Sequence, residues 1–521
     1  MARGQDVIEL LKGSDEIKLD GSTGNYIITG NVVFKKDNAK LYCDSAYYNL
    51  VYDNIRAYGN VQLNKQDTLN MFCDSLFFDT NKNFAKLYGN VRIRDSEYKL
   101  TTDSMDYDLD KNVGIYKNKG KITSITSSDE LTSVVGYFYP ESKQFNFRKN
   151  VVYKSDDYTV TTDTLEFNGY SKKAYFFGPT EIKGNNSLMY CEKGWYDINN
   201  NTGVLQENAF IDREDLYIAA DSLYYSAEDS IYIGNKNVSI KDTANSLAFQ
   251  GDYAINDQKN NYSFITGHAL AKRYDDEDTL YIHADTLHNR LDSVGEPVLI
   301  ECYYGVQLFR GDMQGVCDSL TYNRESGEMN LYTTPVLWAK EAQLSGDTIS
   351  IYEKDNQIER AFLRKQGLII THVDSTDYYN QVAGTILNAY FDSSEIHSVE
   401  IERNAKTIYF LEDEEETDST IIIHRKGMNR IYSSSIRLGF EGGDIETATY
   451  IENPDGVLYP MDKIKSKEER VEQFKWNPKR RPLSWQFMIF SEQERATILH
   501  IFQVMCRPFI PELKPNDEKT E

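Results

Sequence analysis

The chain has 521 residues, 40% of them hydrophobic, and a formal net charge of −24 at pH 7. This acidic balance excludes nucleic-acid binding through a basic surface, which requires clustered Lys and Arg. No run of about 18 or more apolar residues occurs, so no transmembrane helix is predicted. Residues 1–5 carry no apolar signal core, which indicates either a cytoplasmic protein or an export signal missing from this sequence.

Residues 1–21 are predicted to form a polar N-terminal lead-in. From residue 22 to residue 350, a phrase recurs in which a small residue precedes Asp and Ser or Thr follows it. The repeated aspartates lie about 30 residues apart, or about twice that distance where a weaker copy intervenes. Such a period is typical of repeat arrays, in which similar units stack into one extended body. The aspartates are Asp44, Asp74, Asp103, Asp163, Asp221, Asp285, Asp318 and Asp347.

The side chains around each Asp alternate in character, but the alternation changes phase at the Asp. In most copies apolar or small residues stand three and one positions before it, and apolar or aromatic residues stand two and four positions after it. Alternation predicts a half-buried strand, and the change of phase predicts one inserted residue. We therefore expect a β-bulge or corner at each Asp, with the Asp and Ser or Thr side chains bonded to unpaired backbone.

A second phrase, Gly-Asn-Val, stands between successive aspartates, most clearly at Gly30, Gly59 and Gly89. Gly and Asn tolerate positive φ and mark a turn, whereas the alternating residues that follow predict a strand. Each unit should therefore hold two or three short strands joined by polar loops. No amphipathic helical stretch interrupts the repeats, so the predicted fold class is all-β.

The pattern weakens after residue 350. Residues 351–460 are predicted to hold degenerate repeats, with the acidic run at 412–418 as a solvated loop. Residues 461–521 are predicted to be a linker and C-terminal tail, rich in Lys, Arg and Glu up to 481. Apolar residues at near-helical spacing predict a short terminal helix between 491 and 506, and the prolines that follow prevent regular structure.

The sequence contains no persuasive catalytic or metal-binding constellation. Its seven histidines are scattered, and His283 and His288 have no convincing third ligand. The repeated Asp could suggest calcium binding or a glycosidase carboxylate pair, but an enzyme needs one special pair and here the Asp recurs in every unit. Four of the six cysteines occupy the small position before the Asp, where other copies have Thr, Ala or Gly, which favours buried fillers. One bridge between Cys43 and Cys73 remains open.

The phrases at 57–61 and 87–91, each followed by a strand and then by Cys73-Asp74-Ser75 or Thr102-Asp103-Ser104, resemble the OstA/LptA-like family. That family includes periplasmic LptA and the N-terminal domain of LptD, and the resemblance covers roughly residues 24–460. It implies an elongated β-jellyroll, or β-taco, of antiparallel strands folded into a V with an apolar interior. It also implies a non-enzymatic protein without a cofactor or a metal.

Family members hold the acyl chains of lipopolysaccharide in the apolar interior. The resemblance therefore implies a periplasmic protein, with outer-membrane association as an alternative, in a conduit from the inner to the outer membrane. Its expected partners are lipopolysaccharide or a similar glycolipid and other Lpt-type proteins or further copies of itself, joined end to end by strand pairing. The implied groove residues are Val32, Phe34, Leu41, Tyr48, Val61, Leu63, Met71, Leu76, Phe78, Val91, Ile93, Leu100, Met105 and Tyr107.

Two other interpretations stay open at this stage. The chain could be a structural or adhesive envelope protein with a closed core and no lipid. It could also be a polysaccharide-active β-solenoid enzyme, although that requires a local cluster of unlike carboxylates. Alternation shows that one face of each strand is apolar, but it cannot distinguish an open groove from a closed core.

Overall fold

The structure, a computed structural model, describes residues 8–489 except 66–68, 95–96, 276–277, 294–296, 355–356, 374–376, 394, 418–419 and 443. Within this part of the chain, the fold consists of 34 strands and three short 3₁₀ helices, and every strand pairing is antiparallel. The predicted all-β fold of antiparallel strands is therefore confirmed. The terminal helix expected between 491 and 506 lies outside the described residues.

The chain divides into two compact units. Unit 1 comprises Met1–Ala244 and Ile255–Lys259, and unit 2 comprises Asn245–Ala254 and Asn260–Glu521. The strands of unit 1 are β1 (Glu9–Leu10), β2 (Glu16–Asp20), β3 (Asn25–Lys36), β4 (Ala39–Asn49), β5 (Asn54–Lys65), β6 (Leu69–Asp79), β7 (Phe84–Arg94), β8 (Tyr98–Asp108), β9 (Val113–Tyr116), β10 (Gly120–Ser124), β11 (Glu130–Ser133), β12 (Val135–Tyr139), β13 (Gln144–Lys154), β14 (Tyr158–Asn168), β15 (Lys173–Gly184), β16 (Ser187–Asp197), β17 (Thr202–Arg213), β18 (Leu216–Ser226) and β19 (Ile231–Asp242).

Strand β20 (Leu247–Asp257) contributes residues to both units. The strands of unit 2 are β21 (Tyr262–Tyr274), β22 (Thr279–Leu291), β23 (Pro297–Phe309), β24 (Met313–Asn323), β25 (Glu328–Tyr332), β26 (Val336–Ala339), β27 (Ala342–Ser345), β28 (Thr348–Lys354), β29 (Gln357–His372), β30 (Tyr379–Asp392), β31 (Glu395–Thr417), β32 (Thr420–Glu441), β33 (Asp444–Ile451) and β34 (Asp455–Pro460). The helices η1 (Met461–Lys463), η2 (Pro478–Arg480) and η3 (Trp485–Phe487) follow β34.

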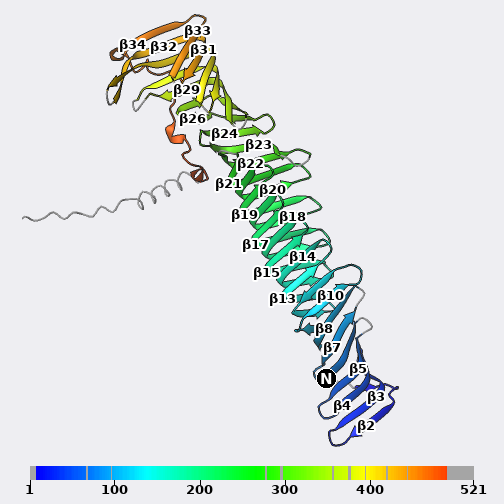
Figure 1. Ribbon diagram of the computed structural model, residues 1–521. Helices are drawn as coiled ribbons and strands as arrows, with labels where there is room; N and C mark the ends of the chain where they lie inside the picture. The colour runs from blue at the N-terminus through cyan, green and yellow to red at the C-terminus, as the bar shows by residue number, and fades with distance from the viewer. Residues whose placement is uncertain are drawn as a thin grey trace, which may run out of the picture. The chain divides into compact units, whose positions relative to one another are not determined.

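In unit 1 most strands pair with the next along the chain, so that the strands stack in sequence order (Figure 1). Three places depart from this order: β1 and β2 both pair with β3, β8 pairs with both β9 and β10, and β13 pairs with both β11 and β12. The register of nearly every long pair shifts at its middle, as between Thr29 and Val32 in β3. The shifts lie at one level of the stack and divide the unit into two half-sheets.

We call these half-sheets arm A and arm B and the line of register shifts the vertex. Arm A holds the residues before each repeated Asp and after each Gly-Asn, such as Met71 and Leu63. Arm B holds the residues after each Asp and before each Gly-Asn, such as Leu76 and Ala57. The hairpin loops of the two arms form the tips, and the space between opposite tips is the mouth. Inward-facing residues of both arms form one hydrophobic cluster in unit 1.

In the clearest repeats, the vertex is held by a contact between the Asp and a Gly-Asn pair whose Asn follows the Asp by sixteen residues. Gly59 and Asn60 both have positive φ, of 74° and 43°, and the Asn60 side chain donates to Asp44 Oδ2 at 2.9 Å. A Cβ on Gly59 would lie 2.4 Å from that carboxylate oxygen, so Gly is needed for both its φ and its size. The same side-chain bond joins Asn90 to Asp74 at 2.8 Å.

The sequence predicts an inserted residue in each Asp strand, whereas the structure has the extra residue in the neighbouring Gly-Asn strand. In the Asp strands, two residues separate the inward positions at the vertex, for example Asp44 and Ser45 between Cys43 and Ala46. In the Gly-Asn strands, three residues separate them, for example 58–60 between Ala57 and Val61. The register shift therefore arises because the Gly-Asn strand carries one residue more than the Asp strand that it pairs with.

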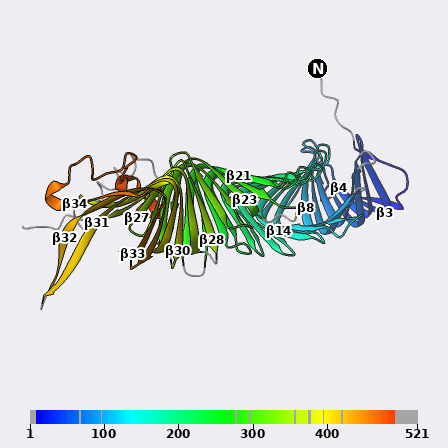
Figure 2. The ribbon, with the colours of Figure 1, turned by 90° about the horizontal axis from the view of Figure 1, so that it is seen from above.

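Unit 2 repeats this pattern in β21–β24 and β29–β32. Strand β24 pairs with both β25 and β26, so the chain again breaks at a vertex, where Asp347 lies between β27 and β28. The acidic run at 412–418 is not a loop up to residue 417, because its backbone continues β31 and pairs with β32. Figure 2 shows the long β31–β32 hairpin, in yellow, extending past its neighbours.

The interpretation of residues 461–481 as a linker is wrong. This segment packs on outward-facing residues of unit 2, where Val471 is buried and its N–H donates to Gln381 Oε1 at 2.9 Å. The Gln343 side chain donates to the Lys475 carbonyl at 2.6 Å and accepts from the Asn477 N–H at 2.8 Å. We call residues 461–489 the strap; the outward glutamines of the sheet hold its backbone in place.

Candidate functional site

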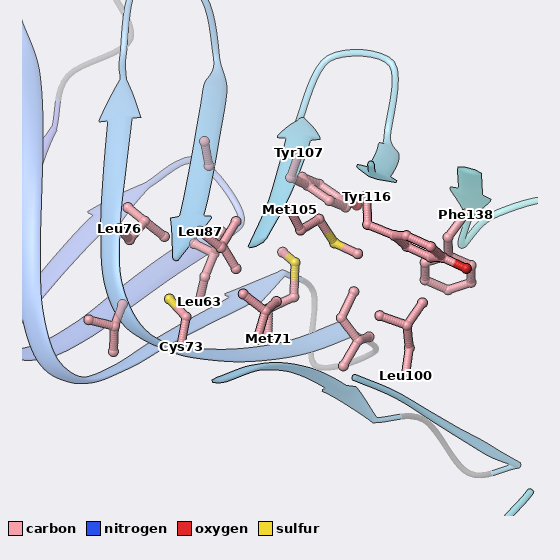
Figure 3. Close-up of a cluster of buried hydrophobic side chains, with 14 of the residues drawn as sticks. Leu63, Met71, Cys73, Leu76, Leu87, Leu100, Met105, Tyr107, Tyr116 and Phe138 are labelled. Atoms are coloured by element: carbon pink, nitrogen blue, oxygen red, sulfur yellow. The ribbon is translucent and has the colours of Figure 1, made fainter. Parts of the chain in front are cut away.

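The residues predicted to line the groove face inward, but most of them fill the interior rather than line an open groove. All except Tyr48, which is half-buried, have side chains that are buried, with at most 8% exposure at Phe78. Figure 3 shows Met71, Leu63 and Leu100 of arm A facing Leu76, Leu87 and Met105 of arm B. Here the side chains of the two arms are long enough to meet. The predicted groove at residues 28–107 is thus a packed core, which we call the filled segment.

The mouth of the filled segment is bridged by lysines from the tips of arm A. Lys36 Nζ donates to the Thr80 carbonyl at 2.7 Å and to Asn83 Oδ1 at 2.6 Å in the opposite tip. Lys65 Nζ donates to the Leu109 carbonyl at 3.0 Å and to Asn112 Oδ1 at 3.2 Å, one repeat further along. The equivalent bonds in successive repeats close this part of the interior at its outer edge.

Open space appears further along unit 1, in a cavity of about 530 Å³ between the two arms. Its volume lies within the range of known small-molecule sites, about 300–1,000 Å³. The deep part is apolar, with Phe147, Leu165 and Phe176 near the vertex. Aromatic residues nearer the mouth, Tyr98, Tyr153, Tyr158, Phe167 and Tyr196, complete the walls. We call residues 122–199, together with Tyr98, the cavity segment.

The boundary between the two segments is occupied by aromatic side chains. The Tyr116 ring lies against the vertex where Gly120 and Gly136 leave room for it, since a Cβ on either glycine would lie within 2.5 Å of the ring. Its hydroxyl hydrogen-bonds Ser133 at 2.7 Å, and burial raises its pKa to about 12. Phe138 and Phe145 stack beside it with ring centroids 5.0 Å apart.

Interior positions beyond this boundary are less completely buried. Met189 and Ala174 occupy the same repeat positions as Met71 and Ala85, which are fully buried, but both are half-buried. At the mouth, Arg213 of arm A donates to the Tyr232 hydroxyl of arm B at 3.2 Å. The interior between the arms is therefore less tightly filled at these positions than at residues 28–107, and the next bridge across the mouth lies at Arg213.

An ion-pair bridge flanks the cavity on the side of the filled segment. Glu97 of arm A lies 3.3 Å from Lys172 Nζ and 3.5 Å from Lys143 Nζ, both at the tips of arm B. These bonds, led by that from Lys172, lower the pKa of the Glu97 carboxyl. Because Glu97 and both lysines are solvent-accessible, this bridge is weaker than a buried pair.

The mouth of unit 2 carries a buried version of such a bridge. Glu353 lies 2.8 Å from Arg273 and 2.9 Å from Arg310, and its side chain is 4% exposed. Arg273 also donates to the Tyr322 hydroxyl at 2.6 Å, and Arg310 is 2.6 Å from Asp312. Both arginines and the glutamate are thus fully paired, and the interior of β21–β28 is closed at this point.

The described residues contain no cluster of three or more His, Cys, Asp or Glu that could hold a metal ion. His283 and His288 instead bond the Ala269 carbonyl and the Tyr262 hydroxyl. Cys43, Cys73, Cys191, Cys302 and Cys317 are buried and free, and burial raises the pKa of the Cys43 thiol to about 11. None of the helices within the described ranges could cross a membrane.

The repeated aspartates lie at the vertex and none of them lines the cavity. The sequence pattern placed Leu165 and Phe167 inward, two and four positions after Asp163, but it missed most other cavity-lining residues, because the stretch between Asp103 and Asp163 has no Asp-Ser or Asp-Thr phrase. A usable signal was present, since aromatic residues concentrate in 137–176 at inward positions.

Comparison with protein families matches residues 6–163 to the OstA-like protein family. Among solved structures, the chain is similar to the crystal structure of LptH from Pseudomonas aeruginosa, described as the LptA-homologous periplasmic component of a conserved lipopolysaccharide transport device. That likeness has 13% sequence identity and a TM-score of 0.22, and it covers 28% of this chain and 95% of LptH. A search of curated proteins finds no match. Residues 6–163 are an OstA-like region, so the resemblance predicted for roughly residues 24–460 is confirmed up to residue 163.

Proposed function

We propose that this chain is a periplasmic lipopolysaccharide-binding protein that holds acyl chains between the arms of unit 1. The observation that best supports this proposal is the apolar cavity near the end of the OstA-like region, which is lined by aromatic side chains from both arms. Each CH₂ group transferred from water into such a wall contributes about 0.8 kcal/mol, so a few acyl chains supply ample binding energy without any catalytic group.

In this proposal the chain forms part of a conduit between the inner and outer membranes. The match of residues 6–163 to the OstA-like family and the resemblance of the repeats to LptA-like proteins support that role. Strands at the ends of the two units, such as β2 and β34, offer edges for pairing with Lpt-type partners or other copies. No covalent chemistry is part of the proposal.

A second candidate is a structural envelope protein with a closed core. The filled segment favours it, because side chains and lysine bridges leave no accessible groove at residues 28–107. Under this reading the cavity would be a packing defect and would not take up lipid.

Photo-crosslinking separates the two candidates. The full chain would carry p-benzoylphenylalanine at Phe167 in the cavity, at Phe78 in the same repeat position of the filled segment, or at exposed, outward Phe177. We expect lipopolysaccharide adducts at 167 only. Equal adducts at 177 would indicate surface adsorption, and no adduct at 167 in the folded protein would favour the closed-core candidate.

A further inference from the structure

The polar groups of the cavity lie at the arm tips, where a lipid head group would meet the protein. Arm A contributes the carboxylates of Asp129, Glu130 and Asp157, and arm B contributes the ammonium of Lys172. The deep walls are apolar, so an acyl chain would point toward the vertex and the head group toward these tips. The charges at the mouth therefore bear on which head group is accepted.

Two of these four charges are neutralised by partners. Lys172 is paired with Glu97 at 3.3 Å, and Glu130 is paired with Lys121 at 2.6 Å. Within the described part of the chain, neither Asp129 nor Asp157 forms an ion pair. The mouth of the cavity thus retains two uncompensated negative charges beside apolar walls.

The tyrosines next to these carboxylates are neutral hydrogen-bonding groups. Tyr153 and Tyr158 line the same wall with ring centroids 5.9 Å apart. Burial is the main cause that raises the pKa values of both hydroxyls, and the charge of Asp129 is a smaller cause that also raises them, so they stay protonated at neutral pH. Carboxylate acceptors, phenolic hydroxyls and aromatic faces together suit the hydroxyl groups and ring faces of a sugar.

We infer that the part of the lipid head group that enters this mouth carries no net negative charge and presents hydroxyl groups, as a neutral sugar does. This inference rests on the proposed function and specifies its ligand class. A phosphate in the same place would face Asp129 and Asp157, whereas Lys172 of the cavity lining is already paired with Glu97. Like charges at short range repel. Phosphate groups of a glycolipid would accordingly remain outside the mouth.

The test compares two probes with the same alkyl chain, dodecyl maltoside and dodecyl phosphate, below their micellar concentrations. Binding to the full chain is measured by calorimetry at low and at physiological ionic strength. We expect the maltoside to bind about tenfold more tightly at low salt, with a smaller difference at higher salt because exposed charges are screened. Equal or tighter binding of the phosphate would overturn the inference and leave the acyl-binding function standing. Binding of neither probe would overturn both.

A charge-removal variant identifies the residues responsible. In Asp129→Asn/Asp157→Asn, phosphate binding should improve several-fold and maltoside binding should change little. The matched control, Asp212→Asn/Asp215→Asn, removes the same charge from exposed positions of arm A outside the cavity. If the control improves phosphate binding as much as the cavity variant does, overall charge is responsible and the inference fails.

Discussion

The filled segment and the cavity segment of unit 1 are built from the same repeat, yet the interior of the first is packed with side chains and the interior of the second contains a cavity. Met71 stands three positions before Asp74, and Met189 stands three positions before Glu192, which takes the place of the repeated Asp. On arm B, Ala85 and Ala174 likewise occupy equivalent positions of their repeats. Only the first member of each pair is fully buried. The repeat therefore fixes the direction of a side chain, whereas the lengths of the facing side chains and the bridges at the mouth decide whether space remains.

The largest effect on stability is expected at the buried ion-pair bridge of unit 2, where Glu353 joins Arg273 and Arg310. Glu353→Gln should lower the local free energy of unfolding by about 3–5 kcal/mol, because two buried arginines lose their shared carboxylate. Hydrogen exchange of β21 and β28 measures the loss, and exposed Glu325→Gln is the control. An effect no larger than that of the control would mean that mouth bridges do not hold closed regions together.

Truncating the two methionines at equivalent repeat positions, Met71 and Met189, sharpens the comparison within unit 1. Met71→Ala should cost about 2–5 kcal/mol, because it leaves a cavity in a packed core. Met189→Ala should cost less, about 1 kcal/mol, because its side chain is already half-exposed. The local opening free energies of β6 and β16, from hydrogen exchange, test this order. Equal losses would show that the interior around β16 is packed as tightly as the filled segment.

Replacing the two alanines at equivalent repeat positions, Ala85 and Ala174, by a larger residue tests the same difference in packing from the opposite direction. Ala85→Leu should destabilise β7 by about 1–3 kcal/mol, because no space surrounds its fully buried side chain. Ala174→Leu should leave stability nearly unchanged and weaken dodecyl maltoside binding, because Ala174 lines the cavity. Thermal unfolding and calorimetric titration give the two readouts. Unchanged binding by Ala174→Leu would place the ligand elsewhere.

The smallest effect is expected at the exposed bridge beside the cavity. Glu97→Gln should cost only a few tenths of a kcal/mol but speed the exchange of bound probe, since the bridge spans the mouth. The folded-state pKa of Glu97 is lowered, so its stabilising contribution is present above its unfolded pKa and is lost as the pH falls through the folded value. Exchange in the unchanged chain should accordingly accelerate in acid, and Glu97→Gln should respond less to pH.

The sequence contains enough information for the strands, the vertex and the direction of each side chain. These features depend on neighbours within one repeat, as for Gly59 and Asp44, so a short pattern records them. The cavity depends instead on residues that meet from different repeats, such as Tyr98 and Phe145, whose ring centroids lie 6.4 Å apart. The strap was missed because Gln343 and Gln381 are ordinary outward residues until a distant segment covers them.

The strap also constrains the order in which unit 2 is completed. Its binding groups belong to β24, β27 and β30, as when Gln314 accepts from Arg481 at 2.8 Å, so they exist only after those strands have paired. During synthesis the strap emerges after all the strands, and until then the outward face around Trp338 and Ile370, both buried in the finished protein, stays open to water. Newly made chains should therefore be most prone to aggregate just before residues 461–489 dock, because docking of the strap has to follow the pairing of these strands.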